Sequence, residues 1–369
     1  MSASQIEIQL IAAITAAACA LPGVILVLRR MSMLSDAISH TVLLGIVIGF
    51  FITEDLASPL LVFGAAAVGV LTVSLTSLLE RTRLFKEDAA IGLVFPALFS
   101  IAVLLISRYA GNVHLDTDAV LVGELAFAPF DRFIVFGRDL GPRGLYVMLG
   151  ILLANLLFIT LFYKELKLTT FDAGLAASLG FAPVLLHYIL MSLVSLTVVG
   201  AFDVVGSILV VALIVTPPAA AYLLTDHLGR MIGLSVLIGA LSAIGGYWLA
   251  SLLDASIAGS MATMAGIIFF LVFLFAPEHG LASAARRRVR QKWDFAQTML
   301  AIHLFNHENT PEYLQESRFE HLHEHLRWDE AFSAQVVKRA LDANLIQRRN
   351  GALALTTVGR ERARTALTH

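Results

Sequence analysis

Long apolar runs that contain few charges dominate the hydrophobic pattern of the chain. Nine of these runs have about the 20 residues that a helix needs to cross a bilayer. We place the spans at Ile8–Leu28, Leu34–Ile52, Ser58–Leu79, Ala89–Ser107, Gly144–Tyr163, Pro183–Phe202, Val204–Leu224, Met231–Leu253 and Met261–Phe275. The pattern predicts an all-α polytopic membrane domain with about nine transmembrane helices, over residues 1–280.

Beyond the ninth run the pattern becomes that of a soluble domain. Residues 281–293 are expected to form a basic linker, whose sequence RRRVRQK can attract anionic membrane lipid. Within residues 294–369, the piece from Phe332 to Thr365 has the order helix, turn, helix, short strand, Asn350-Gly351 hairpin turn, strand, helix. We therefore expect a small α+β, winged-helix-like domain in the cytoplasm.

Composition and charge support a membrane protein and give it an orientation. Apolar residues make up 58% of the 369 and charged residues only 15%, which is more apolar than a water-soluble globule of this size requires. Basic residues gather between alternate spans, and such residues favour the cytoplasmic side. They are Arg29, Arg30, Arg81, Arg83, Lys86, Lys164, Lys167, Arg230 and the 286–292 cluster. This distribution predicts an N-terminus outside and a C-terminus in the cytoplasm.

The segment RRMSMLSDAISHTVLLG, from Arg29, places two titratable residues in an otherwise apolar span. Asp36 and His40 are four residues apart, so they project from the same face of a helix. Such groups are costly at membrane depth unless they pair, face a cavity or hold an ion. We interpret both as candidate metal ligands. One carboxylate and one imidazole suit zinc, manganese or iron(II), so the pair does not select the metal.

The seventh span contains two adjacent prolines. Pro217 and Pro218 lack the N–H of a helix residue, so carbonyls one turn earlier lose their partners. In a membrane such a break persists only where protein buries it or where it lines a cavity. Asp203, just before this span, is expected either to cap the helix or to contact the transported cargo.

The segment KELKLTTFDAGLAASLGFAP, Lys164–Pro183, is too long for a simple turn between spans. It predicts a short amphipathic helix that stops at Gly180. This helix is either loop filler or a docking element for a cytoplasmic partner. The chain itself lacks the G-x-x-x-x-G-K-[ST] motif, so energy from ATP would have to come from a separate subunit. We expect a translocation subunit that is not an enzyme and holds no tightly bound cofactor.

Histidines in the C-terminal region form two pairs with helical spacing. His303 and His307 are four residues apart, as are His321 and His325. Imidazoles with nearby carboxylates suit zinc or a similar ion, so a regulatory metal site is one interpretation. The alternative is a solvated helix with exposed histidines, which the lack of cysteine and the irregular ligand order favour.

Five motifs in order resemble the membrane permease of metal-ion ATP-binding cassette importers, the zinc, manganese and iron uptake family. They are the Arg29 segment, KEDAAIGLVF from Lys86, LVGELAF from Leu121, FDAGLAASLG from Phe171 and the double-proline span. The resemblance covers about Ile8 to Pro277. It implies a multi-pass protein of the bacterial inner membrane that forms a homodimer, or a pair of closely related permeases, bound to cytoplasmic ATPase subunits and fed by an extracytoplasmic metal-binding protein.

The same resemblance assigns roles to single residues. It places the family's transmembrane metal ligands at the element containing Ser35, Asp36, Ser39 and His40. It places the ATPase-coupling helix at Phe171, Asp172, Ala176, Leu179 and Gly180.

The C-terminal domain resembles that of bacterial metal-dependent repressors. The helix Ser333–Asn344, with Lys338 and Arg339, would occupy the recognition position. Plentiful acids in this region favour a protein-contact or dimerisation role over nucleic-acid binding. Two other functions stay open for the whole chain: an ATP-independent secondary metal transporter, and a membrane-anchored metal-responsive regulator.

Overall fold

The computed structural model describes residues 2–55, 58–109, 125–135, 138–308, 310–311, 313–319, 322, 326–349 and 351–368. The chain divides into two compact units, residues 1–280 (unit 1) and residues 281–369 (unit 2). Each unit has a hydrophobic core of its own.

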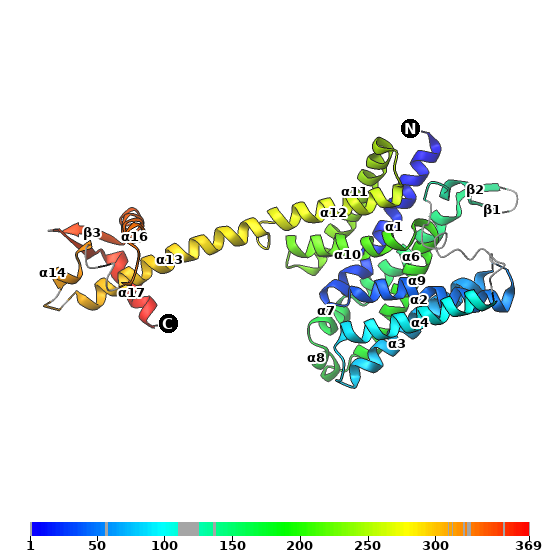
Figure 1. Ribbon diagram of the computed structural model, residues 1–369, viewed down its shortest axis with the longest axis horizontal. Coiled ribbons are helices and arrows are strands. Elements are labelled where there is room, and N and C mark those ends of the chain that lie inside the picture. Colours follow the sequence, from blue (N-terminus) through cyan, green and yellow to red (C-terminus); the bar gives the residue numbers. More distant parts are fainter. Residues whose placement is uncertain are drawn as a thin grey trace. The chain divides into compact units, whose positions relative to one another are not determined.

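Unit 1 is a bundle of long apolar helices (Figure 1). Among the described residues, nine helices are long and apolar enough to cross a membrane, which confirms the predicted number. They are α1 (Ala3–Leu28), α2 (Met33–Thr53), α3 (Pro59–Arg81), α4 (Glu87–Tyr109), α6 (Arg143–Leu161), α9 (Pro183–Val205), α10 (Ser207–Leu224), α11 (Leu228–Leu253) and α12 (Ile257–Phe275).

Short elements lie at the two ends of this bundle (Figure 1). The 3₁₀ helix η1 (Ala128–Phe130) and the antiparallel hairpin of β1 (Arg132–Val135) and β2 (Arg138–Pro142) lie near the N-terminal end of α1. Helices α7 (Tyr163–Phe171) and α8 (Ala173–Ser178) lie at the other end. Since α1 has 26 residues, the two ends are separated by about 39 Å along its axis.

Small residues set the distances between the helices that surround the candidate metal ligands. Helices α2 and α3 cross where Gly45 faces Gly64, and a Cβ on either glycine would overlap the backbone of the other helix. The Thr72 hydroxyl donates to the Thr41 hydroxyl at 2.8 Å, one turn of α2 before this crossing. Close approach through small residues is the usual way in which membrane helices pack. It fixes α2, the helix that carries Asp36 and His40.

The double proline interrupts the backbone hydrogen bonds of the seventh span without ending the helix. Helix α10 runs from Ser207 to Leu224 through Pro217 and Pro218, and both rings are buried. Pro218 removes the N–H that would have bonded to the Ile214 carbonyl. Gly23 of α1 packs directly against that carbonyl, and a Cβ there would overlap its oxygen. The freed carbonyl is therefore buried in protein.

The helix boundary before α10 also differs from the prediction. Helix α9 continues to Val205, and the chain breaks at Gly206, whose φ is +81°. Gly206 is the N-terminal cap of α10, so the expected capping role of Asp203 is wrong. Asp203 lies instead in the last turn of α9 with an exposed side chain.

Unit 2 combines helices with one hairpin in the part that the structure describes. Its elements are α13 (Leu281–His307), α14 (Tyr313–Glu316), α16 (Glu330–Asp342), β3 (Ile346–Arg349), β4 (Ala352–Leu355) and α17 (Thr357–Thr368). Strands β3 and β4 pair antiparallel, with Arg349 opposite Ala352. Leu300, Leu304 and Val336 pack in the core. Residues 281–293, which were expected to form a linker, are the first half of helix α13. The predicted helix Ser333–Asn344 corresponds to α16.

Candidate functional site

Asp36 and His40 form a pair on the first two turns of α2. The His40 Nε2 atom lies 3.6 Å from the Asp36 Oδ1 atom, as the spacing of four residues predicts. Their side chains are 34% exposed for His40 and 46% for Asp36. The pair is therefore accessible in a single chain and is not sealed inside the bundle.

The two serines of the same element point away from this pair. Ser35 and Ser39 are buried, and their hydroxyls donate to the carbonyls of Ser32 and Ser35 at 2.8 and 2.9 Å. Both hydroxyls are thus satisfied within α2. Of the four residues of this element, only Asp36 and His40 have accessible side chains. Only their carboxylate and imidazole are therefore placed to bind an ion.

Aromatic rings of α4 support the imidazole. The His40 ring centroid lies 5.4 Å from that of Phe95 and 6.0 Å from that of Phe99. The hydrogen bond from Thr72 to Thr41, the residue after His40, holds the backbone of the same turn. The histidine is therefore positioned by both neighbouring helices, which is the rigidity that a metal ligand requires.

A basic cluster joins the end of α1 to α7 and α9. The Arg29 guanidinium donates to Thr169 and Thr170 at 3.1 and 3.2 Å and lies 3.5 Å from His187 Nδ1. Burial lowers the pKa of Arg29 below its usual value. A cavity of about 580 Å³ opens beside it, lined also by Arg81, Arg83 and Glu80. The sequence did not reveal this cluster, because its members are about 140 residues apart.

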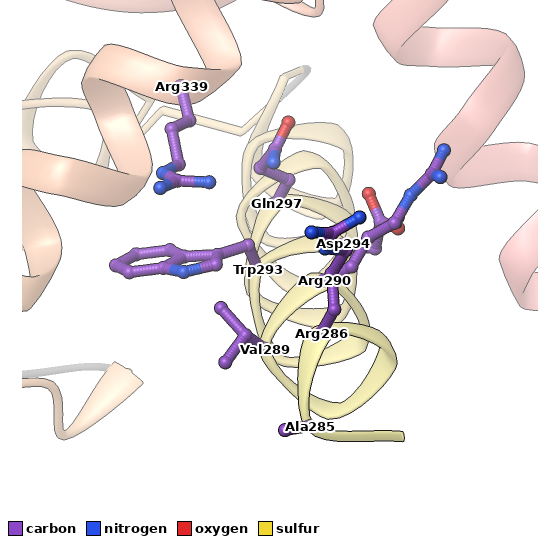
Figure 2. A pocket seen from close by; sticks show the side chains of 8 residues that line it. All are labelled: Ala285, Arg286, Val289, Arg290, Trp293, Asp294, Gln297 and Arg339. Carbon is purple, nitrogen blue, oxygen red and sulfur yellow. Dashed lines mark ion pairs between the residues drawn. The ribbon is translucent and has the colours of Figure 1, made fainter. Parts of the chain in front are cut away.

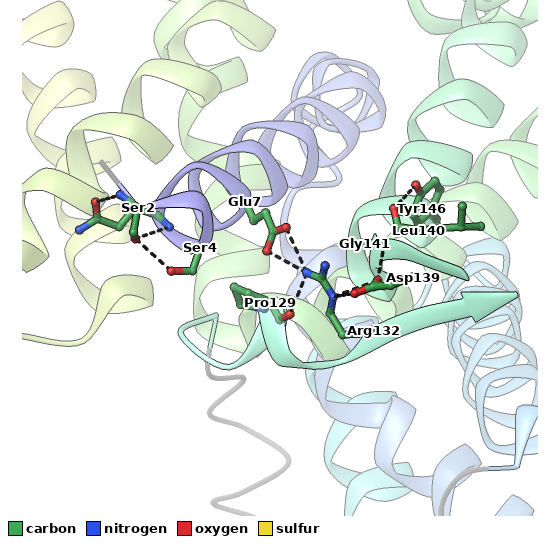
Figure 3. A network of polar contacts seen from close by, with 10 residues as sticks. Ser2, Ser4, Glu7, Pro129, Arg132, Asp139, Leu140, Gly141 and Tyr146 are labelled. Atoms are coloured by element: carbon green, nitrogen blue, oxygen red, sulfur yellow. Dashed lines mark hydrogen bonds and ion pairs between the residues drawn. The ribbon is translucent and has the colours of Figure 1, made fainter. Parts of the chain in front are cut away.

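At the opposite end, Arg132 of β1 bridges two carboxylates (Figure 3). Its guanidinium donates to Glu7 of α1 at 3.0 Å and to Asp139 of β2 at 2.8 Å. The hydrogen bond from Arg132 lowers the pKa of Asp139, and the Asp139 and Glu7 carboxylates raise the pKa of Arg132. The network ties the hairpin to the start of α1.

The predicted coupling segment consists of two short helices separated at Asp172. The Asp172 carboxylate accepts from the Leu175 N–H at 2.8 Å, which is the N-terminal cap of α8. The C-terminal end closes through bonds from Gly180 N–H to Ala177 O and from Phe181 N–H to Ala176 O, both 3.1 Å. Gly180 has a φ of +87°, so the expected glycine stop is confirmed.

Side chains of this segment divide into anchored and exposed groups. Ala176 is fully buried and holds α8 against the bundle. Phe171 is 67% exposed and Leu179 is 61% exposed, with Leu175 exposed between them. Exposed apolar side chains gathered on one element are typical of a protein contact.

In unit 2, the structure places two of the four predicted histidine ligands. His303 and His307 lie together on α13, beside Glu316 of α14. His321 and His325 lie outside the described residues. Glu316 was not predicted as a ligand, because the sequence shows only that it is one of several acids in the region.

Arg339 of α16 makes a contact within unit 2 (Figure 2), whereas the Lys338 side chain is exposed. The Arg339 guanidinium lies 4.2 Å from the centroid of the Trp293 ring, in a cation–π contact. Trp293, Arg339 and the arginines at 286 and 290 line a cavity of about 620 Å³. Arg339 is thus engaged with α13.

These features define a multi-pass integral membrane protein with a carboxylate–imidazole pair near one end of its bundle. Residues 5–276 match the family described as the ABC 3 transport family. The chain belongs to this family.

Relatives and a solved structure agree with this assignment. The chain is 49% identical over 353 residues to the zinc transport system membrane protein TroD of Treponema pallidum (strain Nichols), covering 96% of each chain. It is 47% identical over 274 residues to the manganese transport system membrane protein MntD of Bacillus subtilis (strain 168), covering 74% of this chain and 92% of MntD. Since 353 residues exceed the length of unit 1, the similarity to TroD extends into unit 2.

The structure titled PsaBC from Streptococcus pneumoniae in complex with Fab matches with a TM-score of 0.62 and 28% identity. The match covers 76% of this chain and 94% of that one. The similarity therefore includes the arrangement of the helices as well as the sequence.

Proposed function

We infer that this chain is the membrane permease of an ATP-binding cassette importer for a divalent transition metal. The observation that carries the inference is the Asp36–His40 pair, held on α2 in a chain of the ABC 3 transport family. Relatives named for zinc, manganese and iron transport support a metal as cargo. The cargo is a substrate, and the pair provides a nitrogen and an oxygen that all three metals accept.

The pair is incomplete as a metal site within one chain. Two side chains supply two ligands, whereas transition metals take four or more. The 46% exposure of Asp36 leaves room for a second permease to approach. A homodimer, or a pair of related permeases, would bring two such pairs together and complete the coordination of the ion.

Docking of an ATPase subunit is assigned to the segment from Phe171 to Gly180. Its exposed Phe171, Leu175 and Leu179 form an apolar contact surface, and the chain carries no nucleotide-binding motif of its own. The Arg29 cluster connects this segment to α1 and α9. Movement of the docked subunit would therefore reach α7 and, through Arg29, the ends of α1 and α9.

We assign the Arg29 end of the bundle to the cytoplasmic side of the membrane and the Arg132 end to the outer side. Basic residues at the Arg29 end support this assignment. The β1–β2 hairpin would then lie on the side from which an extracytoplasmic metal-binding protein delivers its ion.

Unit 2, as a winged-helix-like domain, is assigned to protein contacts in the cytoplasm. A DNA-reading helix needs basic side chains that are free to reach the DNA. Arg339 instead stacks on Trp293, which favours a protein-contact role. A dimer of permeases would hold two copies of unit 2 at high effective concentration, so even a weak contact would form.

Reconstitution tests the class of transporter. Proteoliposomes containing the permease and its ATPase subunit should accumulate the metal only with ATP and the binding protein. Accumulation that persists with the permease alone would indicate a secondary transporter instead. Sequence-specific DNA binding by the full chain, without any metal uptake, would indicate a membrane-anchored regulator.

A further inference from the structure

Three side chains of types that bind metal ions converge within unit 2. His303 and His307 come from α13 and Glu316 comes from α14, and one ligand atom of each lies within 4.8 Å of the others. The two imidazole centroids are 4.9 Å apart. A single ion at the centre of such a triangle can bind all three groups.

The backbone on both sides of the triangle is held in place by the core of unit 2. Leu300 and Leu304 of α13 are buried and lie on the same side of the helix as His303 and His307, so core packing fixes the turns that carry both histidines. At α14, the Ser317 carbonyl accepts from the Leu353 N–H of β4 at 2.9 Å. The Tyr313 hydroxyl donates to the Leu353 carbonyl at 3.4 Å. The ligands are thus brought together before any ion binds.

The surroundings of the histidines argue against a simply solvated helix face. His303, His307 and Glu316 are all half-buried. The His307 Nδ1 atom is shielded from solvent and has no hydrogen-bond partner among the residues that the structure describes. A buried polar atom without a partner is costly, and coordination of an ion would remove that cost. His303 Nε2 lies 3.3 Å from the Glu316 carbonyl, a contact that orients the ring.

We propose that His303, His307 and Glu316 form a binding site for a divalent transition metal. Two imidazole nitrogens and one carboxylate oxygen match the ligand sets of zinc and its neighbours, with water in the remaining position. Calcium and magnesium prefer oxygen ligands alone and are not expected here. His321 and His325 are not needed for this site.

Occupancy would join α13 to α14 and, through Leu353, to the β3–β4 hairpin. An ion that binds only this arrangement stabilises it by an amount that depends on the free metal concentration. Unit 2 would then respond to metal in the compartment that it occupies. This regulatory consequence rests on the proposed import function, whereas binding itself does not.

The test is a titration of the full chain in nanodiscs with Co²⁺, followed by its visible absorption. The protein carries Asp36→Ala and His40→Ala, which remove the proposed pathway ligands. One Co²⁺ should bind per chain. His303→Gln, His307→Gln or Glu316→Gln should each weaken binding by about 100-fold, since loss even of a group that only orients a ligand costs about 10–100-fold.

A matched control comes from Asp226, Glu278 and His279, which also lie within reach of one ion but are all exposed. His279→Gln should leave Co²⁺ binding unchanged. Thermal unfolding without metal checks that each variant folds, and Glu316→Gln preserves the size of the side chain.

The proposal would be overturned if each of the three variants bound Co²⁺ as tightly as the parent protein that carries only Asp36→Ala and His40→Ala. Loss of binding only in a His321→Gln/His325→Gln variant would overturn it as well. Because metal transport is disabled in this background, these outcomes do not depend on whether the chain is an importer.

Discussion

The Asn155 side chain of α6 donates a hydrogen bond of 3.1 Å to the carbonyl of Ala18 in α1. This carbonyl is the one that Pro22, four residues later, leaves without its helix partner. Asn155 is buried and also donates to the Thr197 hydroxyl of α9 at 2.9 Å. A side chain from one helix thus satisfies the backbone of another at the centre of the bundle, as a membrane interior demands.

Asn155→Leu should therefore destabilise the protein by about 1–3 kcal/mol, because it leaves a buried carbonyl unsatisfied. Thermal unfolding in detergent measures the effect. In a Pro22→Ala background the newly introduced backbone N–H can bond to the Ala18 carbonyl, so the same Asn155 substitution should cost less. If Asn155→Leu destabilises the protein equally in the wild-type and the Pro22→Ala backgrounds, the assigned hydrogen bond between Asn155 and the Ala18 carbonyl is contradicted.

Gly23→Ala should disrupt the contact between α1 and α10. Its new methyl group would overlap the Ile214 carbonyl oxygen, which belongs to backbone and cannot move aside cheaply. We expect a marked loss of folded protein after detergent extraction, measured by size-exclusion chromatography. Gly150→Ala is the control, since a Cβ there meets no atom within 4 Å. Similar yields of both variants would be inconsistent with the described packing.

Gly180→Val should uncouple ATP hydrolysis from transport. A β-branched residue at a φ of +87° is strained by about 1–2 kcal/mol, while the space around the position is open. The end of α8 should shift without a steric clash. Metal-stimulated ATPase activity of the purified complex is the measurement, and Gly180→Asn, which tolerates this backbone better, should retain more coupling. Wild-type stimulation in the valine variant would refute the docking assignment.

The Arg132 network makes a prediction about pH. Arg132 lowers the folded-state pKa of Asp139, so the carboxylate stabilises the fold above its unfolded pKa. This contribution to stability is lost as the pH falls through the lowered folded-state pKa of Asp139. The difference in melting temperature between wild type and Asp139→Asn should stay constant from about pH 7 to 5 and shrink below about pH 4. Asp131→Asn is the control. A difference that grows on acidification would contradict the sign of the shift.

Much of unit 1 could be predicted because bilayer thickness fixes the length of apolar runs and helical spacing fixes the Asp36–His40 pair. The α9–α10 boundary was misplaced because hydrophobicity does not register a backbone break at Gly206. Contacts between distant residues, such as Asn155 with Ala18, leave no local pattern. Glu316 was missed as a ligand for the same reason, since only folding brings α14 beside α13.

The most direct test of the central claim is radioisotope metal uptake by cells that lack other importers and express Asp36→Ala or His40→Ala. Uptake should fall to the level of cells without the transporter, while both variants reach the membrane in normal amounts. His227→Ala, which alters an exposed histidine elsewhere, should transport normally. Near-normal uptake by both the Asp36 and the His40 variants would contradict their role as ligands in the metal pathway.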